Sequence, residues 1–198
     1  MIRLGLFGGT FDPVHYGHLN PLETARKELN LDQLLLLPNP RPPHKQHLPL
    51  TPYVHRRQML EIALSEFPEF EIADYEETAV GVAYTSDTVR RIVSCLPENT
   101  YEVWLIIGAD SLVELPLWHN PEEIFELAKI AVLPRPGVDL NQSRPEYRSR
   151  VYELHSPLLD ISATQIRDLL QAGETPDNLL PVNVIKYIRE NGLYGISK

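Results

Sequence analysis

The residues that most directly suggest chemistry are two histidines at the end of a loop that begins with two glycines. The loop follows a short apolar run at 2–7 and reads Gly8-Gly9-Thr10-Phe11-Asp12-Pro13-Val14-His15-Tyr16-Gly17-His18. Paired glycines let a backbone approach a ligand closely. A helix that begins after such a loop presents free N–H groups and the positive end of its dipole to an anion. His15 and His18 can then both face one phosphate group.

Two other interpretations of this loop are weaker. Its glycine spacing matches neither a dinucleotide fingerprint nor a P-loop, and no Gly-Lys-Ser/Thr follows. Metal ligation by His15 and His18 is conceivable, but the loop adds no cysteine and only the Asp12 carboxylate, so we expect no metal held by protein ligands. A tight turn with solvated histidines would leave the order of these residues unexplained.

A second candidate anion site lies near the end of the chain, at 162–167. Ser162 has Gln165 three residues further on, which is the capping-box pattern of a helix start. Thr164 and the first free N–H groups could receive an anion. The planar guanidinium of Arg167 suits phosphate oxygens. Taken alone, the segment is better explained as a capped helix with a solvated arginine, and only together with the first loop does it indicate an anion site.

The elements that position these loops alternate between apolar runs and amphipathic segments. We expect strands at 2–7, 34–37, 70–73, 103–107, 130–133 and 151–154, and helices at 17–29, 53–66, 86–95, 122–128, 162–171 and 182–191. In the second helix, Val54, Met59, Ile62 and Ala63 are expected on one face. The polar segment 137–150 is expected to be a surface connection.

Such alternation predicts an α/β fold, a Rossmann-like doubly wound sheet that is mostly parallel and covered on both faces. We expect one domain over 1–198, with a helical C-terminal part at about 162–198. Ligands of these folds bind outside the carboxyl ends of the strands, where strand order reverses. The rule selects the loops after strands one, two and four.

Composition limits the partners and the compartment. The net charge of −9 disfavours a broad nucleic-acid-binding face and favours a small phosphorylated substrate. No run approaches the roughly 20 apolar residues of a membrane span, and the apolar start is too short for a signal peptide. Cys95 is the only cysteine, which favours a reducing, cytoplasmic compartment. The oligomeric state is left open, a homo-oligomer included.

The two motifs together resemble those of a known superfamily. Residues 8–18 resemble the (H/T)xGH nucleotidyltransferase signature in its GGTFDPxHxGH form, which is typical of bacterial nicotinate mononucleotide adenylyltransferases. Residues 161–167 are similar to the second motif, ISSTxxR, with Ala163 in place of the second serine. The resemblance extends from Ile2 almost to the end of the chain. It implies a nucleotidyltransferase fold and an adenylyl transfer from ATP, with Mg²⁺, to nicotinate mononucleotide in NAD biosynthesis.

The resemblance also implies residue roles. The ATP-binding residues would be Gly8, Gly9, Thr10, Phe11, His15, His18, Ser162, Thr164, Arg167 and, near the adenosine, Arg135, with His15 and His18 catalytic. The acceptor-binding residues would be Lys45, Tyr84, Thr85, Asp110 and Trp118. In the family, backbone N–H groups of the turn at 84–88 receive the nicotinate carboxylate, and an aromatic residue at position 118 stacks on the ring. Mg²⁺ would be held mainly by ATP and water.

Three alternatives remain at this stage. The acceptor could be nicotinamide mononucleotide, both mononucleotides, or another phosphate ester. The chain could instead be a non-catalytic nucleotide sensor on the same fold, although both phosphate-binding motifs are intact. A purely structural protein would leave both motifs unexplained. Whether residues 38–52 order only with substrate is a further question that the sequence leaves open.

Overall fold

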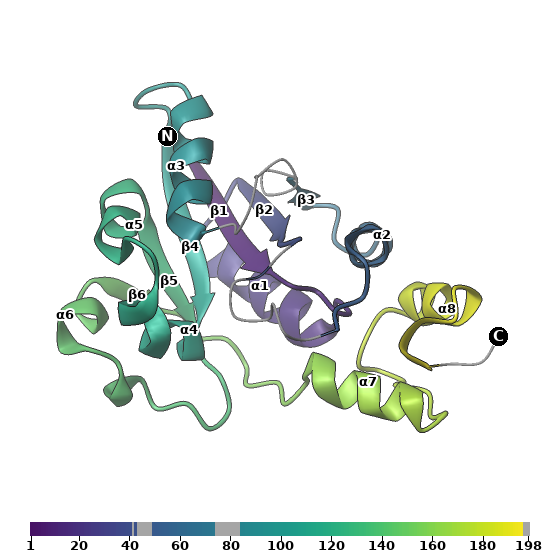
Figure 1. Ribbon diagram of the computed structural model, residues 1–198. Helices are drawn as coiled ribbons and strands as arrows, with labels where there is room; N and C mark the ends of the chain where they lie inside the picture. Colours follow the sequence, from purple (N-terminus) through teal and green to yellow (C-terminus); the bar gives the residue numbers. More distant parts are fainter. Residues whose placement is uncertain (41, 43–48, 74–83, 196–198) are drawn as a thin grey trace.

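A six-stranded parallel sheet forms the centre of the computed structural model, which describes residues 1–40, 42, 49–73 and 84–195 (Figure 1). The strands are β1 (Ile2–Gly9), β2 (Gln33–Pro38), β3 (Phe70–Ile72), β4 (Tyr101–Gly108), β5 (Lys129–Leu133) and β6 (Val151–Glu153). Their order is β3-β2-β1-β4-β5-β6, and every described pair is parallel. This confirms the doubly wound α/β fold, with strand order reversing between β1 and β4.

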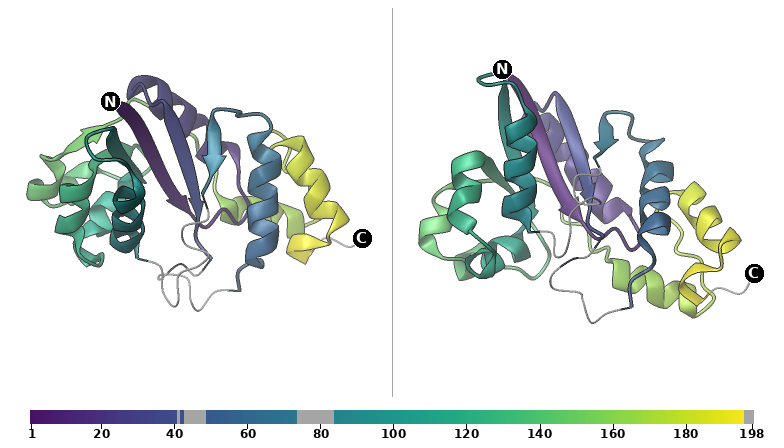
Figure 2. Two further views of the ribbon diagram at one scale, coloured as in Figure 1. Left: turned by 90° about the horizontal axis from the view of Figure 1, so that it is seen from above. Right: turned by 45° about the horizontal axis from the view of Figure 1, so that its top comes forward.

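The helices occupy both faces of the sheet (Figure 2). They are α1 (Tyr16–Glu28), α2 (Tyr53–Leu64), α3 (Thr85–Cys95), α4 (Ala109–Glu114), α5 (Pro121–Leu127), α6 (Pro145–Arg148), α7 (Ala163–Gln171) and α8 (Val182–Glu190). The six predicted helices agree with the structure to within about two residues at each end. The short helices α4 and α6 were not predicted.

Alternate residues of the strands contribute to two separate core layers. Leu6, Leu105 and Ile107 belong to the layer under α3, α4 and α5. Phe7 and Ile106 belong to the opposite layer, which also contains buried residues of α1, α2, α7 and α8. Successive side chains of a strand point to opposite faces, so apolar runs without alternation suit a sheet covered on both sides. The C-terminal helices therefore share the core of the N-terminal half.

Two expectations about local packing held only in part. Helix α2 buries Arg56, Met59, Leu60 and Ala63, whereas Val54 is exposed. The segment 137–150 is more than a surface connection, because it contains α6 and buries Tyr147, whose ring stacks on Phe125.

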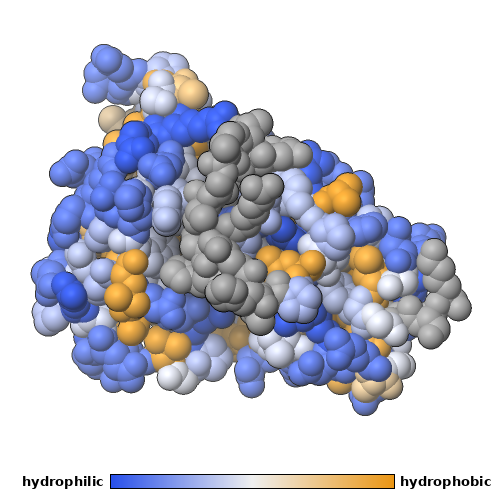
Figure 3. Space-filling model, in the orientation of Figure 1, coloured by the Kyte–Doolittle hydropathy of each residue, from blue (hydrophilic) through white to orange (hydrophobic). Residues whose placement is uncertain are grey.

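The surface seen in Figure 3 is mainly hydrophilic, with hydrophobic residues in small separate groups. Within the described ranges, none of the helices is long and apolar enough to cross a bilayer.

Candidate active site

Two cavities lie at the carboxyl ends of the central strands. The larger has a volume of about 780 Å³ and the smaller about 250 Å³. Phe7, Gly108 and Arg135, at the ends of β1, β4 and β5, line both cavities. The cavities therefore meet at the point where strand order reverses, which is where such folds bind ligands.

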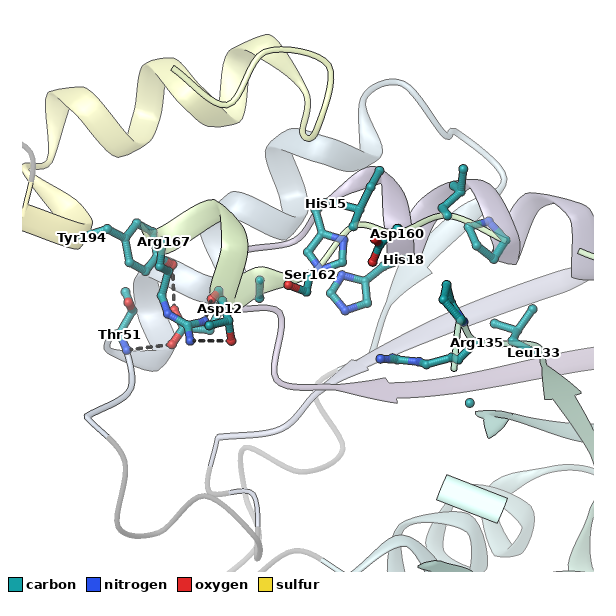
Figure 4. A pocket seen from close by; sticks show the side chains of 18 of the residues that line it. Asp12, His15, His18, Thr51, Leu133, Arg135, Asp160, Ser162, Arg167 and Tyr194 are labelled. Carbon is teal, nitrogen blue, oxygen red and sulfur yellow. Dashed lines mark hydrogen bonds between the residues drawn. The ribbon is translucent and has the colours of Figure 1, made fainter. Parts of the chain in front are cut away.

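The two histidines of the first loop line the larger cavity as a stacked pair. Their ring centroids are 3.7 Å apart at an interplanar angle of 24°. His15 is buried just before α1, and His18 lies one turn into that helix with the ring of Phe11 at its edge. Both face the segment that contains Asp160 and Ser162 (Figure 4). The first motif thus points at the second, as two parts of one phosphate site would.

The charge state of the pair follows from its environment. Burial, and secondarily the positive charge of Arg135, lower the pKa of His15 to about 3. His15 is therefore neutral at pH 7 in the protein without ligand. A neutral imidazole carries one N–H, which can donate a hydrogen bond to a phosphate oxygen. The environment therefore leaves His15 a neutral hydrogen-bond donor rather than a fixed positive charge.

Gly17 explains how closely the two motifs approach. A Cβ atom at this position would lie 2.8 Å from the carbonyl oxygen of Ile161 and 2.9 Å from Nδ1 of His15. Both distances are too short for a real Cβ contact. The glycine between the histidines is thus needed where the start of α1 passes the segment that leads into α7.

The second motif lines the larger cavity next to the two histidines. The hydroxyl of Ser162 accepts a hydrogen bond from the backbone N–H of Gln165 at 3.2 Å, which confirms the predicted N-cap. Arg167 donates to the hydroxyl of Thr164 at 3.2 Å and to the carbonyl oxygen of Asp12 at 2.8 Å. Ser162, Ala163, Thr164 and Arg167 all line the cavity. Arg167 therefore joins the two motifs directly.

Asp12 has a role that the sequence did not reveal. Its carboxylate is buried and accepts hydrogen bonds from the hydroxyl of Tyr194 at 2.6 Å and the backbone N–H of Thr51 at 3.2 Å. Burial and the neighbouring Asp12 raise the pKa of Tyr194, which stays protonated as a donor. The first loop is thereby bonded to the residues before α2 and to the C-terminal turn. All three residues line the larger cavity.

An ion pair stands where the two cavities meet. Arg135 lies 3.3 Å from Asp110 of α4, and both side chains are about half exposed. Gly108 leaves room for this pair, because a Cβ there would collide with the Asp110 carboxylate. The predicted adenosine residue Arg135 thus contacts the predicted acceptor residue Asp110.

The smaller cavity contains most of the predicted acceptor residues. Its lining includes Gly8, Gly9, Asn39, Pro42, Tyr84, Thr85, Ser111, Trp118 and His119. Thr85 begins α3, so the N-terminal end of an eleven-residue helix opens on the cavity. The Tyr84 ring lies 4.5 Å from the His119 ring. An aromatic face and a helix N-terminus together suit a flat anionic group.

Some predicted site residues have other positions. Gly8 and Gly9 line the smaller cavity rather than the larger, and Thr10 and Phe11 are not among the lining residues of either. The Phe11 side chain is buried in the core. Lys45 lies outside the described residues. ATP binding by residues 8–11 and acceptor binding by Lys45 remain predictions.

Among the described residues, no group of three or more histidine, cysteine, aspartate or glutamate side chains is placed to hold a metal ion.

Comparison with known proteins places these features in one family. The sequence model of the cytidylyltransferase-like family matches residues 6–169. A protein of Thermomicrobium roseum named "Probable nicotinate-nucleotide adenylyltransferase" is 41% identical over 98% of this chain and 92% of its own length. A protein of the same name from Geobacillus kaustophilus is 40% identical over 98% of this chain and 87% of its own.

Solved structures show the same fold at lower identity. The Plasmodium falciparum nicotinic acid mononucleotide adenylyltransferase complexed with NaAD aligns with a TM-score of 0.81 at 16% identity, over 100% of this chain and 99% of that one. The same protein complexed with APC aligns with a TM-score of 0.80 at 16% identity and the same coverage. At this identity the similarity bears on the fold alone.

Proposed function

The chain belongs to the nicotinate-nucleotide adenylyltransferases of the cytidylyltransferase-like family, and we propose that it forms nicotinate adenine dinucleotide and pyrophosphate from ATP and nicotinate mononucleotide. The observation that carries the proposal is the pair of cavities that share Phe7, Gly108 and Arg135. ATP in the larger cavity and a mononucleotide in the smaller one would bring two phosphates to one place. This is the arrangement that transfer between them requires.

The proposed reaction is a direct attack by the mononucleotide phosphate on the α-phosphorus of ATP. The new P–O bond forms as the bond to the β-phosphate oxygen breaks, and pyrophosphate leaves with that electron pair. Phosphoryl-type transfers depend mainly on positioning and on neutralisation of charge. His15, His18 and Arg167 line the larger cavity and can supply hydrogen bonds and positive charge to the triphosphate. Cys95 is exposed at the end of α3 and is no part of either lining.

We propose that Mg²⁺ accompanies ATP and is held by phosphate oxygens and water. The donor set fits such an ion, because Mg²⁺ usually keeps several waters and needs few protein ligands. Asp160 lines the larger cavity beside the second motif and could hold one of those waters. The ion would neutralise charge on the triphosphate, and the protein residues would orient it.

The acceptor is proposed to be the acid rather than the amide. The N-terminal end of α3 at Thr85 favours a negative group, and Trp118 offers an aromatic face in the same cavity. A ring carboxylate carries a full charge that a carboxamide lacks. The N–H groups at the start of α3 would therefore favour the acid over the amide. We also propose that the enzyme is cytoplasmic, because a chain with a single cysteine suits a reducing compartment.

The test is pyrophosphate release from ATP and Mg²⁺ with each mononucleotide in turn. We expect kcat/KM for the nicotinate form to exceed that for the nicotinamide form by on the order of a hundredfold or more, as for a site that binds one polar group specifically. Equal use of the two acceptors would contradict the proposed acceptor site. ATP binding without any pyrophosphate release would favour a nucleotide sensor.

A further inference from the structure

Arg56 is the largest fully buried side chain of the structure, and it is a charged one. It projects from the first turn of α2 and is 1% exposed. Burial lowers the pKa of its guanidinium, and the negative charge of Asp12 opposes that shift. A buried arginine is costly unless its N–H groups all find acceptors. The buried position of Arg56 therefore suggests that its hydrogen bonds serve a function.

The acceptors of Arg56 are backbone carbonyls from three separate segments. Nε donates to Thr51 at 2.9 Å, and one terminal nitrogen donates to Thr10 at 2.6 Å and to Asn39 at 2.8 Å. The other terminal nitrogen donates to Pro40 at 3.3 Å. Within the described part of the chain, these bonds use four of the five guanidinium N–H groups. A rigid, planar fork of donors suits carbonyls arranged on several sides of it.

Each of these segments leads to one of the cavities. Thr10 belongs to the loop with the paired histidines, and Asn39 lines the smaller cavity where the chain leaves β2. Thr51 lines the larger cavity and donates its N–H to the Asp12 carboxylate at 3.2 Å. The contacts of Arg56 therefore extend to the ATP side through Thr10 and Thr51, and to the acceptor side through Asn39.

We propose that Arg56 is a positioning residue for adenylyl transfer. It holds Thr10, in the loop before the paired histidines, and Asn39–Pro40, after β2, at a fixed separation without touching either substrate. This rests on the proposed function of the two cavities. The backbone N–H of Asn39 also donates to the carbonyl of Gly9 at 2.9 Å, so the two loops are bonded directly beside the arginine. A side chain that is bonded both to Thr10 and to Asn39–Pro40 would set the distance between the two bound phosphates.

The consequence is a specific kinetic signature. Loss of the bridge should leave each substrate able to bind in its own cavity, because neither cavity is lined by Arg56. It should reduce the fraction of complexes in which the two phosphates are aligned. A displacement of about 1 Å can reduce a rate by on the order of a hundredfold. The effect should therefore appear in kcat and not in ATP affinity.

The experiment compares Arg56→Lys with Arg57→Lys. Arg57 is the adjacent residue of α2 but pairs on the surface with Glu61, so its variant is a matched control for the same chemical change. We expect Arg56→Lys to lower kcat about tenfold or more. The Kd for ATP, measured without acceptor, should stay within about threefold of wild type. Arg57→Lys should match wild type in both. Circular dichroism and Tm measurements would identify a temperature at which all variants are folded, and the kinetics would be compared there.

Two results would overturn the inference. Unchanged kcat in folded Arg56→Lys would show that the bridge is unnecessary, and a loss of ATP affinity as large as the loss of rate would indicate a merely structural residue. If Arg56→Lys does not fold, hydrogen exchange of the wild-type protein can test whether Arg56 links these segments. The amides of Asn39 and Thr51 should then share one opening rate, and independent rates would contradict a common bridge. Absence of turnover in the wild type would overturn the proposed function, while the exchange measurement would still test Arg56.

Discussion

Replacement of Gly17 by alanine adds one methyl group where the two phosphate-binding motifs meet. The new Cβ would lie 2.8 Å from the carbonyl oxygen of Ile161, with the His15 ring at 2.9 Å and 3.0 Å on its other side. An ordinary contact begins at about 3.4 Å. The segment before α7 and the His15 imidazole must therefore each move by roughly half an ångström. Both movements are costly, because the first displaces backbone and the second disturbs the stacking of His15 on His18.

The stability cost of this change should be small. Overpacking by one methyl group costs about 1–3 kcal/mol. Alanine in place of glycine in a helix recovers up to about 1 kcal/mol of this. For a chain of this length, about 1–2 kcal/mol of net destabilisation corresponds to a Tm decrease of roughly 2–8 °C. Gly17→Ala should therefore remain folded at 25 °C.

The rate should change far more than the stability. His15 and the start of α7 at Ser162 line the same cavity on either side of Gly17, and the added methyl group would displace both from the proposed triphosphate position. We expect kcat for pyrophosphate release to fall by on the order of ten- to a hundredfold. Asn20→Ala, at an exposed site of the same helix, is the control. A Gly17→Ala enzyme with wild-type kcat would refute the argument that this contact sets the relation of the two motifs.

Two further predictions concern the histidines. The pKa of His15 is lowered to about 3 in the folded state, so the unfolded chain binds a proton first and stability should decrease as pH falls from about 6.5 towards 3. The slope from this group approaches about 1.4 kcal/mol per pH unit, and chemical denaturation should show a flatter profile for His15→Asn. His18→Ala should lose on the order of a hundredfold or more in turnover while its Tm stays near wild type. Near-normal turnover would remove His18 from the mechanism.

The sequence predicted the parts of this molecule that depend on local signals. Apolar runs of strand length and amphipathic periods of helix length placed the long elements, because both faces of a parallel sheet are buried. The Ser162 cap was predictable from the spacing to Gln165, since a capping bond spans three residues. Helix α4 was missed because its six residues directly continue β4 and are too few to show a period.

The connections within the site were not predictable in the same way. Nothing near Arg56 in the sequence indicates that its acceptors are carbonyls of Thr10, Asn39 and Pro40. A signal did exist, because Arg56 precedes Met59, Leu60 and Ala63 at helical spacing and so occupies a core position. A charge at such a position indicates a buried interaction, although it does not identify the partner. Tyr194 and Asp12 are too far apart in the chain for any local pattern.

The contacts of Asp12 also bear on whether the paired histidines bind a metal ion or an anion. One carboxylate oxygen accepts from Tyr194 and the other from Thr51, and the main-chain oxygen accepts from Arg167. The only carboxylate of the first loop is thus engaged in holding three segments together, rather than being presented beside the histidines. In this position the carboxylate orients the loop through the hydroxyl of Tyr194 and the N–H of Thr51. The histidines face the helix start at Ser162, and the N–H groups of a helix start favour an anion.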